Sequence, residues 1–194
     1  MPLQKRQHPK ATINLLDFGF EDAKGLAYFA SKRRHKNKKF MGIGWTKQKG
    51  LITRRRNLKL VWGDALSKAR RIPSESVKIV TSDFLFSEFK VGGADLTALG
   101  RFFEEVTQKM RIELAKQINR ILVPNGRFVV TEYNQNIPPM QSVLAAAGFS
   151  YTVKPLPETK FNRTKFLEMI SAKLRTNPDL LNQMRPMQII ARKK

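Results

Sequence analysis

The sequence predicts an α/β domain in which helices cover both faces of a mostly parallel sheet. Residues 12–39 contain an apolar strand, a glycine-containing turn and a helix in succession. Further along the chain, short apolar runs alternate with segments of helical spacing, a pattern typical of parallel sheets. A chain of 194 residues, 41% of them hydrophobic, is long enough for one domain with a core and short for two. The expected strands are 13–16, 40–45, 58–62, 77–82, 128–131, 149–154 and 187–191.

The helices expected between these strands differ in length. Apolar residues at helical spacing predict one helix at 26–33, a long one at 96–122 and another at 140–147. Pro124-Asn125-Gly126 is expected to stop the long helix, and Gly148 is a suitable residue just beyond the end of the last one.

A long connection at 155–186 precedes the last expected strand, and its middle, 163–174, has helical spacing. A connection of this length is more often functional than idle, although it also suits a helical cover over a sheet edge. The expected organisation is therefore a basic N-terminal arm at 1–11 and a single domain at 12–194. The connection forms a helical insertion in that domain.

The turn after the first strand is a candidate ligand site. The strand ends at Asp17-Phe18-Gly19, and the next helix follows Gly25. In a parallel α/β domain such a turn lies at the carboxyl end of the strand, where nucleotide-like ligands bind. Small residues let the backbone approach the ligand, and a helix N-terminus adds unpaired N–H groups. Because Glu21 and Ala23 replace the further glycines of a dinucleotide fingerprint, an ordinary βα turn is an equal alternative.

The charge balance points to a polyanionic partner. Thirty-seven Lys and Arg against 15 Asp and Glu give a net charge of +22, whereas a small domain needs only about 2–8 charges for solubility. Nucleic acid is the expected partner. The alternative is a generally basic protein from a hot or salty environment. A membrane surface is disfavoured because no strongly amphipathic basic helix stands out.

Acids are scarce in the first third of the chain: residues 1–63 contain only Asp17, Glu21 and Asp22, all in the candidate ligand turn. This suggests a small-molecule pocket beside a phosphate-binding surface. The basic residues form three clusters: Lys5, Arg6 and Lys10 in the arm; Lys32, Arg33, Arg34, Lys36, Lys38 and Lys39 before the second strand; and Lys47, Lys49, Arg54, Arg55 and Arg56 in a short helix or basic loop.

Other features restrict the chemistry and the compartment. The absence of cysteine excludes disulfides, thiolate metal sites and cysteine nucleophiles. No run approaches the roughly 18 apolar residues of a membrane span, and the N-terminus lacks the apolar core of a secretory signal. We expect a cytoplasmic protein, with a nucleolar or organellar location left open. His8 and His35 lie in basic stretches, where a lone histidine is usually a solvated side chain.

Several separated segments resemble the class I S-adenosylmethionine-dependent methyltransferases, particularly the small ones related to quinone and sterol methyltransferases. These segments are Asp17-Phe18-Gly19; 61–65; 79–84; 119–127 with Glu132; and Leu144 with 147–149. Their order and spacing cover about residues 12–154. The resemblance implies a Rossmann-like three-layer sandwich with a seven-stranded sheet whose last strand is antiparallel, and S-adenosylmethionine as cofactor.

The resemblance also implies a donor site built from strand ends. Asp17 and Glu21 would attract the ammonium group of the donor, Asp64 would accept the adenine amine, and the Ala65 N–H would meet a ring nitrogen. Ser82 would lie near the sulfonium. The implied cofactor-binding residues are Asp17, Gly19, Phe20, Glu21, Gly25, Gly44, Trp45, Asp64, Ala65 and Ser82.

The second strand departs from the family pattern. Gly44 stands where the family usually has an acidic residue that holds the ribose hydroxyls. Trp45 follows and offers a ring for stacking on adenine, but it cannot replace a bidentate carboxylate.

The acceptor is indicated less directly. The Ser82–Leu85 segment lacks the paired prolines of enzymes that methylate base amines. Asp83 resembles the aspartate of RNA ribose 2′-O-methyltransferases of the heat-shock type, yet their partner lysine would fall near Thr131. Asp83 is therefore a candidate catalytic base, with a turn or capping role as the alternative.

Together these observations predict an S-adenosylmethionine-dependent methyltransferase that acts on ribosomal or transfer RNA. Residues 32–39 and 54–56 would hold the phosphates. The alternative is a non-catalytic methyltransferase-like RNA-binding protein or ribonucleoprotein assembly component. A small-molecule methyltransferase with an environmental charge is a third reading.

Overall fold

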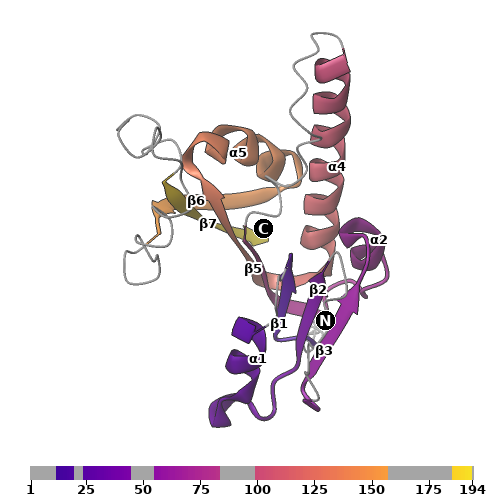
Figure 1. The fold of residues 1–194 in the computed structure, drawn as a ribbon, viewed down its shortest axis with the longest axis vertical. Coiled ribbons are helices and arrows are strands. Elements are labelled where there is room, and N and C mark those ends of the chain that lie inside the picture. The colour runs from indigo at the N-terminus through magenta and orange to yellow at the C-terminus, as the bar shows by residue number, and fades with distance from the viewer. Residues whose placement is uncertain (1–11, 20–23, 45–54, 84–98, 157–184, 194) are drawn as a thin grey trace, which may run out of the picture.

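The computed structural model describes residues 12–19, 24–44, 55–83, 99–156 and 185–193. Its centre is a seven-stranded sheet in the order β3-β2-β1-β4-β5-β7-β6 (Figure 1). The strand bounds are β1 Leu15–Phe18, β2 Phe40–Gly44, β3 Leu58–Trp62, β4 Val77–Asp83, β5 Leu122–Tyr133, β6 Phe149–Pro155 and β7 Pro186–Lys193.

Strand directions confirm the predicted fold class. β1 pairs in parallel with β2 and with β4. On the outer side of these strands, β3 pairs in parallel with β2, and β5 pairs in parallel with β4. β7 lies between β5 and β6 and is antiparallel to both. The strand order reverses between β1 and β4, which is the topological switch point where doubly wound sheets bind ligands.

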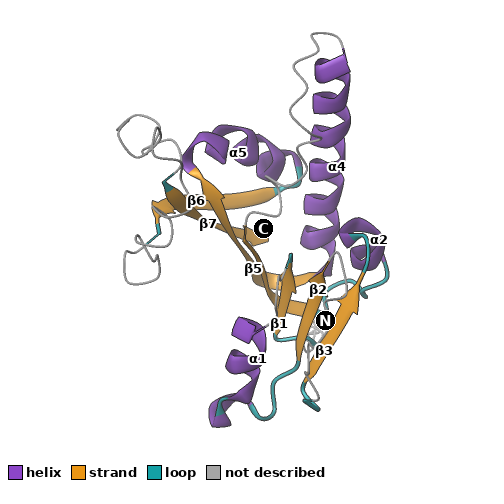
Figure 2. Cartoon of the chain, in the orientation of Figure 1, coloured by secondary structure: helices purple, strands orange, loops and turns teal. Residues whose placement is uncertain are grey.

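Helices pack on both faces of the sheet (Figure 2). Alternate residues of β1 show the two faces: Leu16 belongs to the main core with α2, α4 and α5, whereas Leu15 packs against a smaller core that includes Leu26 of α1. The period-2 alternation of a strand explains this division. The helical bounds are α1 Lys24–Ser31, η1 Arg33–His35, α2 Ala65–Arg70, α4 Leu99–Ile121, η2 Asn134–Asn136 and α5 Ile137–Ala146.

The main core explains why the long helix and the central strands associate. Phe18, Leu114, Ile118 and Phe128 are completely buried and come from β1, α4 and β5. Full burial of a side chain of this size stabilises a fold by roughly 1.5–3 kcal/mol each.

The expected strands and the helices at 26–33, 96–122 and 140–147 are present, with ends shifted by a few residues. Gly148 follows α5 with φ of 80°, as expected beyond a helix end. The short helix α2 is missing from the sequence prediction. The Pro124-Asn125-Gly126 segment does not lie outside the strands as expected, because β5 begins at Leu122 and includes it.

The N-terminal arm at 1–11, residues 45–54 and most of the expected insertion, 157–184, lie outside the described residues. No helix within the described ranges is both long and apolar enough to cross a membrane.

Candidate functional site

Four neighbouring strands, β3, β2, β1 and β4, end on one side of the sheet. We call this side the carboxyl edge and define it by Asp17, Gly19, Gly44, Asp64 and Ser82. The register brings these strand ends together: Phe18 of β1 pairs with Ile43 of β2 and with Ser82 of β4, while Gly44 of β2 pairs with Trp62 of β3. Predicted site residues from distant parts of the sequence thus lie on neighbouring strands at the carboxyl edge.

The end of β1 holds a carboxylate in a fixed position. Asp17 Oδ1 accepts a hydrogen bond of 2.6 Å from Thr81 Oγ1 of β4. Gly19 adopts φ of 79° and donates its N–H to the Ile43 carbonyl at 2.9 Å. Since L-residues rarely adopt this conformation, glycine suits the turn. The negative charge of Asp17 therefore lies on the switch-point strand at a position that β4 defines.

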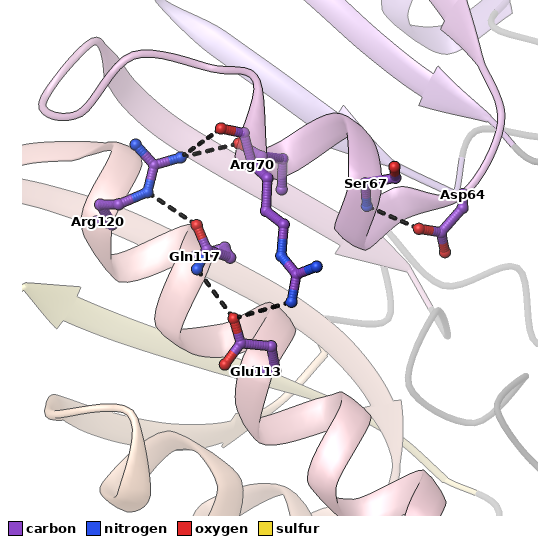
Figure 3. Close-up of polar contacts among 7 residues, drawn as sticks. Asp64, Ser67, Arg70, Glu113, Gln117 and Arg120 are labelled. Atoms are coloured by element: carbon purple, nitrogen blue, oxygen red, sulfur yellow. Dashed lines mark hydrogen bonds and ion pairs between the residues drawn. The ribbon is translucent and has the colours of Figure 1, made fainter.

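The turn after β3 leads directly into α2. Gly63, with φ of 128°, donates its N–H to the Gly44 carbonyl at 2.9 Å and so links the ends of β2 and β3. Asp64 is the N-cap of α2, and its Oδ1 accepts the Ser67 N–H at 2.7 Å (Figure 3). Ala65, the first residue of α2, is buried. One oxygen of Asp64 thus has a structural role, and the residue itself is exposed.

A polar network fixes α2 against α4 and thereby positions the Asp64 turn (Figure 3). Arg120 donates to the carbonyls of Ala69 and Ile72 at 3.0 and 2.9 Å and to Gln117 Oε1 at 2.8 Å. Glu113 accepts from Gln117 at 3.0 Å and forms an ion pair of 3.4 Å with Arg70. Arg120 therefore ties the C-terminal end of α2 to the long helix.

Ser82 is the most unusual residue of the carboxyl edge. It is completely buried, and its hydroxyl has no hydrogen-bond partner within the described part of the chain. A buried hydroxyl without a partner costs about 1–3 kcal/mol, so such a group needs an explanation, and a functional role is one. Its neighbours in the sheet are Phe18 and Val130.

The end of β2 has no side chain that could bind a ligand, because its last residue is Gly44. Gly44 is buried and pairs with Trp62 of β3 in the sheet. Phe20, Glu21, Trp45 and Arg54, four of the predicted site residues, lie outside the described residues. Gly25 is the second residue of α1, and Asp83 ends β4 opposite Thr131 of β5; for both, only the backbone is described.

A polar cluster beside the end of β5 has no place in the predicted site. Glu132 is completely buried and accepts a hydrogen bond of 3.1 Å from Asn136. Burial, together with the Glu132 charge, raises the pKa of Tyr133. A small cavity here is lined by Arg111, Glu132, Asn136, Pro139, Met140 and Val143. The sequence signal was an acid at the end of an apolar strand; its partners come from three other elements.

The predicted phosphate-binding residues occupy the opposite side of the sheet. Arg33, Arg34, Lys36, Lys38 and Lys39 are exposed and precede β2, and Arg55 and Arg56 are exposed and precede β3; Lys32 is partly exposed. Because parallel strands begin on one side and end on the other, these residues flank the strand starts and not the ligand turn. Their expected placement beside that turn is therefore wrong for the described residues.

His35 also differs from its expectation as a solvated side chain. It is buried, with only 4% of its surface exposed, and its Nδ1 donates to the Phe29 carbonyl at 2.8 Å. Its ring packs on Phe29 and Phe40 with centroid distances of 4.4 and 5.7 Å. Phe29 and Phe40 are close to His35 in the sequence, but the basic residues between them gave no sign that the three rings form a cluster.

No protein-family model and no curated protein sequence matches this chain. Solved structures do. Haemonchus contortus phosphoethanolamine N-methyltransferase 2, in complex with phosphomonomethylethanolamine and S-adenosylhomocysteine, matches with TM-score 0.57 and 13% identity. That match covers 95% of this chain and 49% of the other, so the chain spans about half the length of that enzyme.

Two further structures match over more of their own length. The [4+2]-cyclase SpnF matches with TM-score 0.61 and 16% identity, over 95% of this chain and 76% of that one. A chain from the complex between the Haloferax volcanii Trm112 methyltransferase activator and a methyltransferase matches with TM-score 0.59 and 13% identity, over 96% and 85%. Since one of these proteins is a cyclase, the shared architecture alone does not assign a reaction. The chain has the class I S-adenosylmethionine-dependent methyltransferase fold.

Proposed function

We propose that this protein is an S-adenosylmethionine-dependent methyltransferase that acts on RNA, with the donor bound at the carboxyl edge. The observation that carries the proposal is that Asp17, Gly19, Asp64 and Ser82 lie on neighbouring strand ends of the carboxyl edge, where Ser82 is buried without a hydrogen-bond partner in the described residues. A ligand with several hydrogen-bonding groups suits such an edge.

Each group of the donor has a counterpart in this arrangement. The Asp17 carboxylate suits the ammonium of the methionine part, and Thr81 holds it in position. Asp64 uses one oxygen to cap α2 and, being exposed, retains the other for an exocyclic amine. Gly19 and Gly63 have no side chain, so the ligand can approach the backbone closely at these turns. When bound, the donor supplies an electrophilic methyl group, and the protein contributes chiefly alignment.

RNA is the proposed acceptor because of the charge. The chain carries +22, and residues 24–63 contain no Asp or Glu at all. A surface of this composition favours a polyphosphate strand over a small neutral substrate. Ribosomal and transfer RNA are the acceptors we propose, and the ribose 2′-hydroxyl with Asp83 as base is the reaction to test first.

A second candidate function is a non-catalytic RNA-binding protein or ribonucleoprotein component with this fold. Gly44 favours it, because the end of β2 lacks a carboxylate that would hold the ribose hydroxyls of the donor. The two candidates make the same prediction for RNA binding and opposite predictions for donor binding.

Donor binding is the experiment that separates them. Calorimetry with S-adenosylhomocysteine up to millimolar concentration should give saturable heat for the wild type and weaker binding for Asp17→Asn. Glu75→Gln serves as the matched control, since it removes an acid just before the start of β4, where Glu75 pairs with Lys193, and leaves the carboxyl edge unchanged. Transfer of a labelled methyl group from S-adenosylmethionine to total RNA, removed by ribonuclease, then tests catalysis. Absence of heat in the wild type would favour the non-catalytic candidate.

A further inference from the structure

The starts of β2 and β3 carry a second candidate site, on the side of the sheet opposite the proposed donor site. We call this side the amino edge and define it by Tyr28, Lys32, Arg33, Arg34, Lys36, Lys38, Lys39, Arg55 and Arg56. We infer that the amino edge is a binding surface for single-stranded RNA, with Tyr28 as a stacking platform for a base. The inference deepens the proposed function, since it rests on RNA being the acceptor.

Two basic runs that are separate in the sequence form one surface. Asn57 joins them: its Nδ2 donates to the carbonyls of Ala30 at 3.1 Å and His35 at 3.3 Å. Its own carbonyl accepts the Phe40 N–H at 2.8 Å. The turn that carries Arg55 and Arg56 is therefore attached to the loop that carries residues 32–39.

The loop itself is held by backbone bonds and an aromatic base. The His35 N–H donates to the Lys32 carbonyl at 2.8 Å, and the Lys38 N–H donates to the His35 carbonyl at 2.9 Å. Asn14 accepts the Lys39 N–H at 2.9 Å through its side chain. Below them His35 is buried between Phe29 and Phe40. The cationic side chains thus extend from an ordered backbone, which lowers the entropy lost when they bind phosphates.

The charge of this surface is uncompensated in the described structure. The described ion pairs, Arg70–Glu113 and Lys193–Glu75, lie on other elements. Since residues 24–63 contain no acid, neighbouring cations on this surface repel one another, and a polyanion relieves that repulsion.

Tyr28 distinguishes this surface from a merely basic one. It is 65% exposed, so its ring is accessible to a base from solvent. Lys32 Nζ lies 4.5 Å from the centre of its ring. An exposed ring beside a cation is the combination that single-stranded nucleic acid uses, with the base on the ring and the phosphate on the charge.

The position of the surface restricts the substrate. β2 spans five residues from the amino edge to the carboxyl edge, and four steps of about 3.3 Å separate the two edges by about 13 Å. An RNA that contacts both edges must therefore extend along the side of the molecule. A mononucleotide is too short to do so.

The test measures binding of a fluorescent single-stranded RNA of about 12 nucleotides to the full chain, without donor. Tyr28→Ala should weaken binding roughly fivefold or more, because base stacking contributes this much, while Tyr28→Phe should bind like the wild type. Met110→Ala is the matched control, since Met110 is also a large exposed apolar residue but lies on α4. Equal binding by Tyr28→Ala and the wild type would overturn the stacking role.

The charges are tested with two triple variants that have the same net charge. Arg34→Gln, Lys36→Gln and Arg55→Gln together change both runs of the amino edge, whereas Lys116→Gln, Arg127→Gln and Lys154→Gln change exposed residues of α4, β5 and β6. The first triple should weaken binding at least tenfold and reduce the slope of log K against log salt by about 2, or roughly 0.7 per lost phosphate contact. Equal effects of the two triples would overturn the inference.

Competitors identify the partner. An RNA duplex of equal length should compete less well than the single strand, and anionic phospholipid vesicles should not compete; the opposite result in either case contradicts the inference. Failure of donor binding leaves all of these measurements intact. Conversely, if the amino-edge triple variant keeps both methyl transfer and RNA affinity, the result contradicts the inference about the amino edge and leaves the proposed function intact.

Discussion

The carboxyl edge and the amino edge of the sheet consist of different types of residue. The carboxyl edge consists of glycines in left-handed turns, a carboxylate held by a neighbouring strand and a buried hydroxyl. The amino edge consists of exposed Lys and Arg on a backbone fixed by Asn57 and His35. Small residues admit a ligand into the fold, whereas cations on an ordered surface bind a ligand that stays outside it.

This difference separates what topology determines from what composition determines. Any doubly wound sheet places its strand ends at a switch point, so the carboxyl edge follows from the fold. No rule of the fold places Lys and Arg at the strand starts, and their position is a property of this chain. The edges should therefore respond independently to substitution, and the predictions below test that independence.

The largest expected effect is on the amino edge. His35→Ala should lower the free energy of unfolding by about 2–4 kcal/mol, because it removes a buried ring from between two aromatic side chains together with a hydrogen bond. RNA affinity should fall, and S-adenosylhomocysteine affinity should persist in the folded fraction. Urea denaturation and the two binding assays measure this. An equal loss of donor binding would show that the edges are coupled.

Asp17→Asn should have the next largest effect, on the carboxyl edge alone. The amide oxygen can still accept the hydrogen bond from Thr81, so unfolding should be unchanged. Donor affinity should fall roughly 10- to 100-fold, because a hydrogen bond to a charged partner loses about 1.5–3 kcal/mol. Calorimetry at constant pH measures this. A large loss of stability would assign Asp17 to the fold rather than to the ligand.

A pair of substitutions at Asp64 separates its two roles. Asp64→Asn keeps the cap of α2 but presents an amide in place of one carboxylate oxygen, so only donor affinity should fall. Asp64→Ala should also lower the free energy of unfolding by about 1 kcal/mol, the usual value of an N-cap. Thermal denaturation combined with donor titration distinguishes them. Unchanged donor binding in both variants would leave Asp64 with the cap alone.

The sequence predicted the strands and most helices because each carries a local signal: period-2 apolar runs, helical spacing or a glycine at a turn. Asp17, Gly19, Gly44 and Asp64 could be placed at one edge because parallel strands end together. The helix α2 was not predicted because six residues are too few to show helical periodicity, although Asp64 before its first residue is a capping signal.

The position of the amino edge could not be predicted, because it depends on contacts without a local pattern. Asn57 reaches Ala30 and His35 across more than twenty residues of sequence, and nothing in either segment indicates the other. The same applies to Glu132, whose cavity is completed by residues of α4, η2 and α5. The charge of the sequence indicated a polyanionic partner. Only the tertiary structure shows on which side of the sheet the basic residues lie.

The smallest expected effect is also the most specific to the carboxyl edge. Ser82→Ala should leave the free energy of unfolding unchanged or raise it by up to about 1 kcal/mol, because a buried hydroxyl without a partner is itself a cost. Ser76→Ala is the matched control: Ser76 is buried too, but its hydroxyl donates to the Pro73 carbonyl at 2.6 Å, so its loss should destabilise by about 1 kcal/mol. If the Ser82 hydroxyl forms a hydrogen bond with the bound donor, Ser82→Ala should weaken donor binding and leave RNA binding at the amino edge unaffected. Destabilisation equal to that of Ser76→Ala would mean that the Ser82 hydroxyl has a structural role and is not kept for a ligand.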